Sequence, residues 1–160
     1  MAQSNQSNAQ AWGNASEVIG KTIQTTLKAL NKEVSQRTYR ASNELRNAAL
    51  YVLRGKRSGK MYTVPNTKKK YRASAPGEPP AVRTGVFRLS WGTHVRVEKT
   101  GVHFKAVAAI ESRERAGRHL LGELLENGHG HTKPRPYKQK VINRALPKIK
   151  EIYKKPYNGS

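Results

Sequence analysis

Apolar residues recur every three or four positions through the first third of the chain. The series comprises Ile19, Ile23, Leu27, Leu30, Val34, Ala41, Leu45, Ala48 and Val52. This spacing places them on one face of a helix. Asn14 to Glu17 has the pattern of a capping box that would start the helix, and Gly55 would end it. The register is interrupted between Val34 and Ala41, which fits either one long bent helix or two consecutive helices.

Two stretches in the middle of the chain alternate between apolar and polar residues. The apolar positions are Phe87, Leu89, Trp91, Val95 and Val97 in the first stretch, and Val102, Phe104, Ala106, Ala108 and Ile110 in the second. A period of two is typical of β-strands, and turn residues 98–101 between the stretches predict a hairpin. We expect Trp91 and Phe104 in the core. Because a lone hairpin is marginal in water, it needs another strand, a covering helix or a neighbouring subunit.

Two helices are expected after the hairpin. The first is a short amphipathic segment that Asn127 and Gly128 would end; its apolar residues are Leu120, Leu121, Leu124 and Leu125. The second follows Pro134 and Pro136 and has its apolar face at Tyr137, Val141, Ile142, Ala145, Leu146, Ile149 and Ile152. Pro147 falls inside this pattern, where it is expected to kink or split the helix. The element order predicts an α+β fold with a long N-terminal helix, a small antiparallel sheet built on a β-hairpin, and C-terminal helices.

The length of 160 residues fits one domain. Residues 1–13 are mostly Ser, Asn, Gln and Ala, so we expect a disordered N-terminal arm. Residues 14–155 then form a single α+β domain, and residues 156–160 a C-terminal tail. Inside the domain, residues 54–85 have little periodicity and form a long basic loop, in which residues 61–64 could form a short strand.

The charge is extreme for this length, with 31 Lys and Arg against 10 acidic residues and a net charge of +21. Such a surface attracts polyanions or acidic protein surfaces, and both partners remain open. The long loop holds eight positive charges before its first acid, Glu78: Arg54, Lys56, Arg57, Lys60, Lys68, Lys69, Lys70 and Arg72. Residues 68–72, which include Tyr71, combine charge and an aromatic ring as single-strand binders do, with Tyr62 nearby, although a charge run is usually a solvated loop.

Residue types needed for catalysis or metal binding are scarce. The chain has no cysteine and no aspartate, which excludes disulfides and thiolate metal sites and leaves only glutamates for paired-carboxylate chemistry. His129 and His131 have no acid in the same loop, and His119 with Glu123 fits an ordinary helix surface better than a metal site. We expect no catalytic residues, metal, cofactor or small-molecule substrate. The N-terminus lacks the pattern of a secretory signal, and no apolar run approaches the roughly 20 residues of a membrane span.

Two motifs resemble the signatures of a tail-component family of long-tailed bacteriophages. The first is a proline-containing approach followed by Thr-Gly and by Arg and Ser entering a strand; it comprises Pro76, Gly77, Thr84, Gly85, Arg88 and Ser90. The second pairs an acid and a glycine with a later Pro-aromatic step; it comprises Glu126, Gly128, Pro136 and Tyr137. The motifs occur in the family's order, and with the long N-terminal helix the resemblance covers most of the chain from about Ser16 onward.

The resemblance implies a non-catalytic structural subunit of the phage neck, acting in head–tail joining or tail completion. It implies a ring-forming fold like that of tail terminators, with the ring around the DNA passage. The expected partners are further copies in a closed ring of six or twelve, neighbouring head-completion, tail-terminator or tail-tube proteins, and the genomic DNA. The expected location is the virion, after assembly in the host cytoplasm. The alternative is a basic nucleic-acid-binding protein that uses residues 54–72 and the C-terminal helix.

Overall fold

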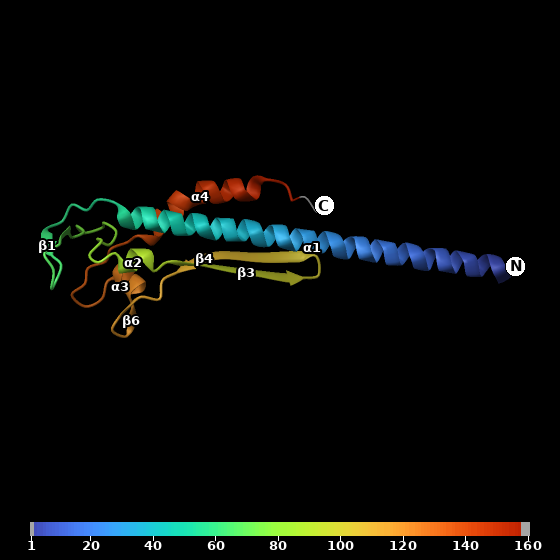
Figure 1. Ribbon diagram of the computed structural model, residues 1–160, viewed down its shortest axis with the longest axis horizontal. Coiled ribbons are helices and arrows are strands. Elements are labelled where there is room, and N and C mark those ends of the chain that lie inside the picture. The colour runs from blue at the N-terminus through green and yellow to red at the C-terminus, as the bar shows by residue number, and fades with distance from the viewer. Residues whose placement is uncertain (1, 158–160) are drawn as a thin grey trace.

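The computed structural model describes residues 2–157, with side chains described from Trp12 onward. The molecule is elongated along one very long helix, α1 (Ala2–Arg54). A hairpin of β3 (Gly92–Thr100) and β4 (His103–Glu111) lies along one side of α1, and α4 (Lys138–Lys154) lies along the other (Figure 1). The hairpin and α4 thus cover two different sides of α1, which forms the middle layer.

The shorter elements gather at the C-terminal end of α1 (Figure 1). They are β1 (Met61–Thr63), β2 (Lys70–Arg72), α2 (Val86–Leu89), β5 (Arg115–Ala116), β6 (His119–Leu120) and α3 (Leu121–Asn127). Among the described residues the strands form three separate two-stranded antiparallel sheets, β1–β2, β3–β4 and β5–β6. This mixture of helices and small antiparallel sheets confirms the predicted α+β class.

The core lies where α1, α4 and the start of the hairpin meet. Its buried residues are Ala48, Ala49 and Leu53 of α1, Val141 and Ala145 of α4, and the aromatic residues Trp91 and Tyr137. The alanines let the two helices approach closely. Polar groups of α1 also bind the hairpin: Ser42 Oγ donates to Ala109 O at 2.6 Å, and Arg46 Nε donates to Trp91 O at 2.8 Å. The predicted burial of Trp91 is confirmed, and Phe104 is half-buried.

The prediction of a disordered arm over residues 1–13 is wrong for the described part, because α1 is already helical at Ala2. Met1 lies outside the described residues. The capping box at Asn14 is also wrong, since that segment lies inside the helix and Ser16 Oγ donates to Gly13 O instead. Of the two alternatives for residues 34–41, the single continuous helix is the one observed. No proline interrupts residues 2–54, and helix elongation costs little once a helix has nucleated.

The predicted first strand begins too early. Gly85 has φ 87°, and the following residues close a helical turn in which Leu89 N donates to Gly85 O and Ser90 N to Val86 O. Residues 86–89 are therefore α2, and β3 begins at Gly92. The predicted apolar face agrees with the structure, in which Val95 lies opposite Ala108 and Val97 opposite Ala106. The predicted turn over residues 98–101 is wrong, because Glu98, Lys99 and Thr100 belong to β3 and pair with β4. The connection is a two-residue turn, Gly101 and Val102, so Val102 is an exposed turn residue and not part of β4.

The helices after the hairpin also differ in detail from their predictions. Leu120 belongs to β6, and α3 begins one residue later. Pro147 lies inside α4 without splitting it. The long basic loop contains the predicted strand at residues 61–63 and also β2, whose register pairs Tyr62 with Tyr71. Of the predicted C-terminal tail, Pro156 and Tyr157 are described and residues 158–160 are not.

Candidate functional site

The basic loop divides into anchored and free side chains. Arg57 donates to the carbonyl oxygens of Val52 (2.9 Å), Gly55 (2.6 Å) and Pro80 (3.0 Å), and Arg72 donates to Gly59 O at 3.1 Å. Burial lowers the pKa of Arg57, and the nearby charge of Glu78 opposes that shift. Eight basic residues precede Glu78, and within residues 2–157 no partner binds the side chains of the other six: Arg54, Lys56, Lys60, Lys68, Lys69 and Lys70. These six are the groups free to meet a polyanion or an acidic protein.

Glu78 closes the loop by binding its two ends together. Its carboxylate accepts hydrogen bonds from Ala75 N (2.8 Å), Ser58 N (3.1 Å) and Ser58 Oγ (2.8 Å). Because these donors stabilise the charged form, they lower the pKa of Glu78 to about 2. The first acid of the loop is therefore a structural clasp, which the sequence pattern did not reveal.

The tip of the loop is the β1–β2 hairpin, in which two tyrosines lie beside the lysine run. The rings of Tyr62 and Tyr71 are 6.1 Å apart between centroids, and Tyr62 is half exposed. Lys68 and Lys69 lie in the turn and Lys70 begins β2. The tip thus presents cations and aromatic faces together, as expected from the sequence.

The second motif of the resemblance builds the start of α4. Glu126 Oε2 accepts from the backbone nitrogens of Tyr137 (2.8 Å) and Lys138 (3.1 Å), so it caps the helix from outside. Gly128 has φ 73°, and a Cβ there would lie 2.7 Å from Thr132 O and 2.8 Å from Pro134 Cδ. Only glycine fits this position without a backbone shift. Pro136 precedes the helix and is exposed.

Tyr137 joins this motif to the first one. Its hydroxyl donates to Gly122 O at 3.1 Å, and its ring packs edge-to-face on Phe87 and Trp91. Burial, together with the charges of Glu126 and Glu123, raises the pKa of Tyr137, so the hydroxyl stays protonated as a donor. The aromatic residue of the second motif therefore contacts the segment that carries the first.

The first motif shapes the backbone on the other side of this junction. Ser90 Oγ lies 2.6 Å from Ser112 Oγ and so joins the two ends of the hairpin. Thr84 Oγ1 accepts from Val86 N at 3.4 Å, beside Gly85 with its positive φ. Pro76 is exposed, and the Gly77 carbonyl accepts from Lys140 Nζ at 3.2 Å. Arg88 has no hydrogen-bond partner among the described residues.

An open groove of about 490 Å³ lies next to this junction. Its apolar lining includes Leu53, Phe87, Leu121 and Leu125, and its basic lining consists of Arg83, Arg88, Arg115 and Arg135. Arg135 is engaged at the carbonyl of Ala75 and also at Ser74 O. Glu114 is the acidic residue of the lining, so the groove is an apolar surface bordered mainly by positive charge.

Of the histidines that the sequence offers as metal ligands, His119 and His129 lie close together in the structure. The rings of His119 and His129 are 4.8 Å apart between centroids. In the described part of the chain, no group of three or more His, Cys, Asp or Glu side chains is arranged to hold a metal ion. None of the helices over residues 2–157 is long and apolar enough to cross a membrane.

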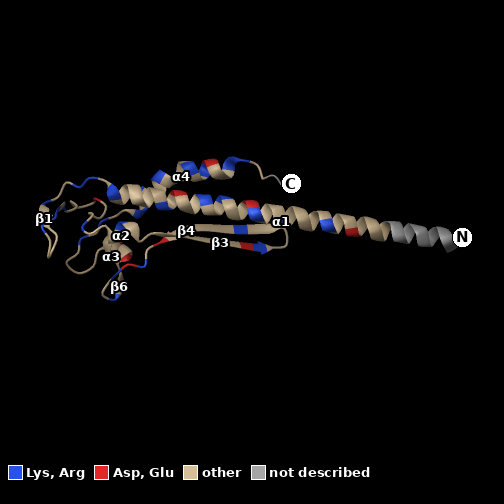
Figure 2. Ribbon diagram, viewed as in Figure 1, with Lys and Arg blue, Asp and Glu red and all other residues tan. Residues whose placement is uncertain are grey.

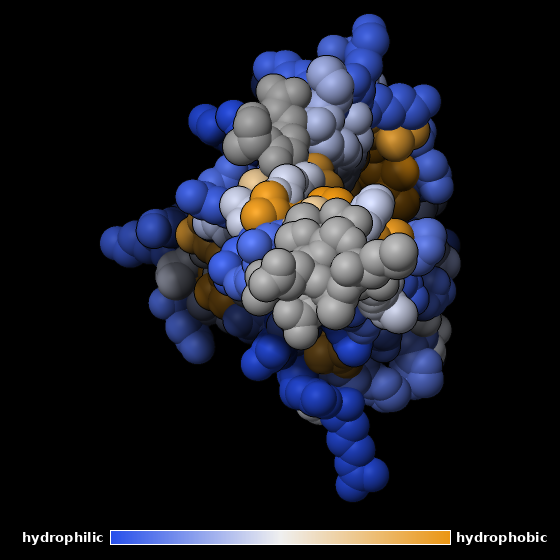
Figure 3. Space-filling model, turned by 90° about the vertical axis from the view of Figure 1, so that its right-hand side faces the viewer, coloured by the Kyte–Doolittle hydropathy of each residue, from blue (hydrophilic) through white to orange (hydrophobic). Residues whose placement is uncertain are grey.

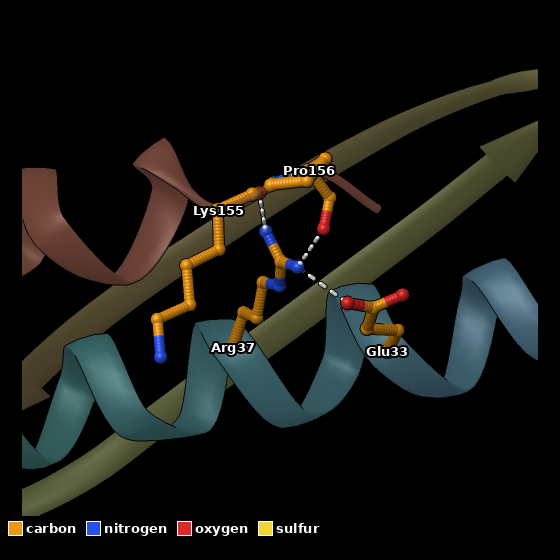
Figure 4. A network of polar contacts seen from close by, with 4 residues as sticks. All are labelled: Glu33, Arg37, Lys155 and Pro156. Carbon is orange, nitrogen blue, oxygen red and sulfur yellow. Dashed lines mark hydrogen bonds and ion pairs between the residues drawn. The ribbon is translucent and has the colours of Figure 1, made fainter. Parts of the chain in front are cut away.

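Sequence reasoning missed Arg37, which binds residues 155–157 to α1 (Figure 4). This buried guanidinium donates to Glu33 and to the carbonyls of Lys155 and Pro156, and it stacks 3.9 Å from the ring centre of Tyr157. The available signal was its position between Val34 and Ala41, on the buried side of the helix.

Comparison with protein families, with curated proteins and with solved structures found no match.

Proposed function

We propose that this chain is a structural, non-catalytic subunit of the head–tail junction of a long-tailed bacteriophage. In this role it assembles as a closed ring of six or twelve copies around the DNA passage, between neighbouring head-completion, tail-terminator or tail-tube proteins. It is made in the host cytoplasm and functions in the virion. The resemblance of the two sequence motifs supports the choice of family, and the contacts of the motif residues support a structural role.

The observation that carries the proposal is that the motif residues make architectural contacts. Glu126 caps α4, Ser90 joins the ends of the hairpin, and Tyr137 packs across both motifs. The polar groups of Glu126 and Tyr137 bind backbone, and Ser90 binds Ser112. Such contacts are expected for residues that maintain a fold and not for an acid, base or nucleophile that must remain available. The two motifs, separated by about 35 residues of sequence, thus serve one junction.

The shape and charge of the molecule are in keeping with this role. A subunit of a ring needs surfaces for copies of itself as well as for the layers above and below. Here the loop segment around β1, which carries most of the six unpaired basic residues, lies at the end of the molecule opposite the N-terminus of α1 (Figure 1). They are available to DNA in the passage or to an acidic neighbouring ring.

The test is a stop codon early in the gene, in a phage that encodes this chain. We expect filled heads and separate tails in electron micrographs, because the joining layer is missing. Adding the purified protein to such an extract should restore joined, infectious particles. A normal yield of infectious tailed particles without the chain would contradict the neck role.

A second candidate, a nucleic-acid-binding protein, is favoured by the tyrosine pair beside the lysine run. Bases can stack on exposed aromatic rings while lysines neutralise phosphates. Binding at low salt is not informative, because any protein of this charge binds DNA there. The informative measurement is single-strand affinity near physiological salt, in which Tyr62→Ala should lose about 1–3 kcal/mol if bases stack on this ring. An unchanged affinity would leave only non-specific charge attraction.

A further inference from the structure

The N-terminal part of α1 extends beyond the rest of the molecule. We call residues 2–25 the overhang; at 1.5 Å per residue, it is about 36 Å long. Figure 1 shows this part of α1 beyond the turn of the hairpin and beyond α4. Three of its large apolar side chains, Trp12, Ile19 and Ile23, are 75%, 59% and 50% exposed.

These three residues continue the apolar stripe that α1 buries farther along. Positions 12, 19, 23, 27, 30 and 34 follow one another at steps of three, four or seven and therefore share a face of the helix. Leu27 and Leu30 are half-buried and Val34 is buried. The stripe is thus covered inside the body of the molecule and uncovered on the overhang.

The overhang is a poor helix on its own. Gly13 and Gly20 each cost about 1 kcal/mol relative to alanine, and an added Cβ at either would meet nothing within 4 Å. Helices in water are held mainly by packing of an apolar face. The overhang therefore needs a covering surface that the described residues do not provide.

The charge of the overhang identifies what kind of surface this is. Its charged residues are Glu17 and Lys21, which pair with each other at 2.6 Å. Removing them from the totals of 10 acidic and 31 basic residues leaves 9 and 30, so the net +21 lies entirely outside the overhang. In the ribbon of Figure 2, the positions of Lys and Arg are concentrated on the rest of the molecule. An acidic protein or a nucleic acid would find no counter-charge on the overhang.

We propose that copies of this chain associate through their overhangs, with the stripe of Trp12, Ile19 and Ile23 packing against the same stripe of a second copy. Elsewhere two copies repel, whereas two neutral overhangs can meet without charge repulsion. The view onto the N-terminal end shows separate apolar patches among hydrophilic residues (Figure 3). The inference rests on the proposed function in one respect, which is that the chain assembles with itself.

The experiment measures the mass of the full chain in solution by light scattering, over a wide range of protein concentration. The wild type should form an oligomer. The double variant Ile19→Gln, Ile23→Gln should shift to the monomer mass while its circular dichroism retains the signal of the body. Val18→Gln is the matched control, because Val18 is an equally exposed aliphatic residue, 63%, on a different face of the same turns. It should leave the mass of the oligomer unchanged.

A second measurement covers the case in which the double variant fails to fold. Since the chain has no cysteine, single variants Ile23→Cys and Val18→Cys can be cross-linked with a short bismaleimide. Cross-linked dimers should form at position 23 in clear excess over position 18. Equal cross-linking yields at positions 18 and 23 would overturn the proposal, and so would an unchanged mass in a folded double variant. A wild type that stays monomeric would also overturn it and would indicate that a different protein covers the overhang.

The two proposals fail separately. If the phage needs the chain for joining but the Ile19→Gln, Ile23→Gln variant still forms the wild-type oligomer, the neck role stands and this interface is ruled out. If the double variant is monomeric but the stop-codon phage yields normal particles, the interface stands and the neck role is ruled out.

Discussion

At the scale of single residues, segments far apart in sequence are joined by a cluster of three aromatic rings and by glutamates that bind backbone nitrogens. Trp91, Phe87 and Tyr137 pack edge-to-face with ring centroids 5.5–5.9 Å apart. Around them, Glu126 and Glu78 hold backbone nitrogens. These residues connect segments distant in sequence, so their substitutions test the fold directly.

Trp91→Ala should lower the free energy of unfolding by about 3–5 kcal/mol, because it removes a buried ring from the junction. Trp91→Phe should cost much less, since it keeps an aromatic ring and removes a buried Nε1 that has no hydrogen-bond partner within the described residues. Urea denaturation of both variants checks this. Equal losses for the two would mean that ring packing is not the dominant contribution of Trp91.

Gly128→Ala should destabilise the protein more than Gly130→Ala. Both glycines have positive φ, 73° and 56°, and Gly128 with ψ 161° lies in a region that is essentially restricted to glycine, so alanine is strained at both positions. At Gly128 the added Cβ would also meet Thr132 O and Pro134, whereas at Gly130 it would meet nothing within 4 Å. Melting curves of the two variants measure the difference, to which the backbone conformation of Gly128 and the Cβ contact both contribute. A larger loss at Gly130 would contradict the loop geometry.

Glu78 should make stability depend on pH in the acid range. Its pKa is about 2 in the folded state against an ordinary 4.5, so the unfolded chain binds the proton more tightly. The stabilisation is therefore complete above about pH 5 and is lost as the pH falls toward 2. Wild type should be more stable than Glu78→Gln at neutral pH, with the difference shrinking on acidification. Thermal melts of the pair at several pH values measure it; a difference that stays constant would contradict the shifted pKa.

At the scale of elements, long periodic segments could be predicted and short or unusual ones could not. Periodicity indicated α1, β3, β4, α3 and α4 because each has a face to bury. It failed over residues 86–89, since four residues with apolar positions at alternate places fit a strand and a helical turn equally well. Only the left-handed Gly85 decides between them. The N-terminal extension of α1 was missed because its composition offers little apolar surface to its own domain.

The candidate site was predicted only in outline. The positions of charge and of the motif residues were visible in the sequence. The roles of Glu78 and Arg37 were not, because each depends on contacts with segments brought close by the fold: Ser58 is 20 residues from Glu78, and Lys155 is 118 from Arg37. No local pattern encodes such distances.

The β1–β2 hairpin gives a prediction at this scale. Charge reversal of Lys68, Lys69 and Lys70 to Glu should leave the melting temperature unchanged, because their side chains are exposed and unpaired among the described residues. In the proposed assembly the same triple variant should join heads and tails poorly.

We also expect amide hydrogen exchange of residues 58–72 to be fast in the free subunit and slower in the assembly, since like charges this dense oppose compact packing without a partner. Normal particle yields from the variant would contradict the assembly role, and full protection in the free subunit would contradict ordering on assembly.

At the scale of the whole molecule, charge and exposed apolar surface lie on different parts of the chain. The dependence of binding on salt concentration can therefore distinguish the two kinds of contact. Two processes are proposed for the chain: association of neutral overhangs, which the +21 bodies oppose, and attraction of the basic loop to polyanions or acidic proteins. Salt screens both charge effects, with a Debye length near 10 Å at 0.1 M and about 3 Å at 1 M. The two processes must therefore respond to salt in opposite directions.

Raising the salt concentration from roughly 0.05 to 0.5 M should strengthen self-association, because screening removes repulsion between bodies while the apolar contact of the overhangs persists. Over the same range DNA affinity should fall steeply, because salt opposes counterion release. Sedimentation and DNA-binding measurements on the same samples test both signs. The double variant at Ile19 and Ile23 should lose the first response and keep the second. Self-association that weakens with salt would mean that copies meet through opposite charges, and the apolar overhang could not then be their main contact.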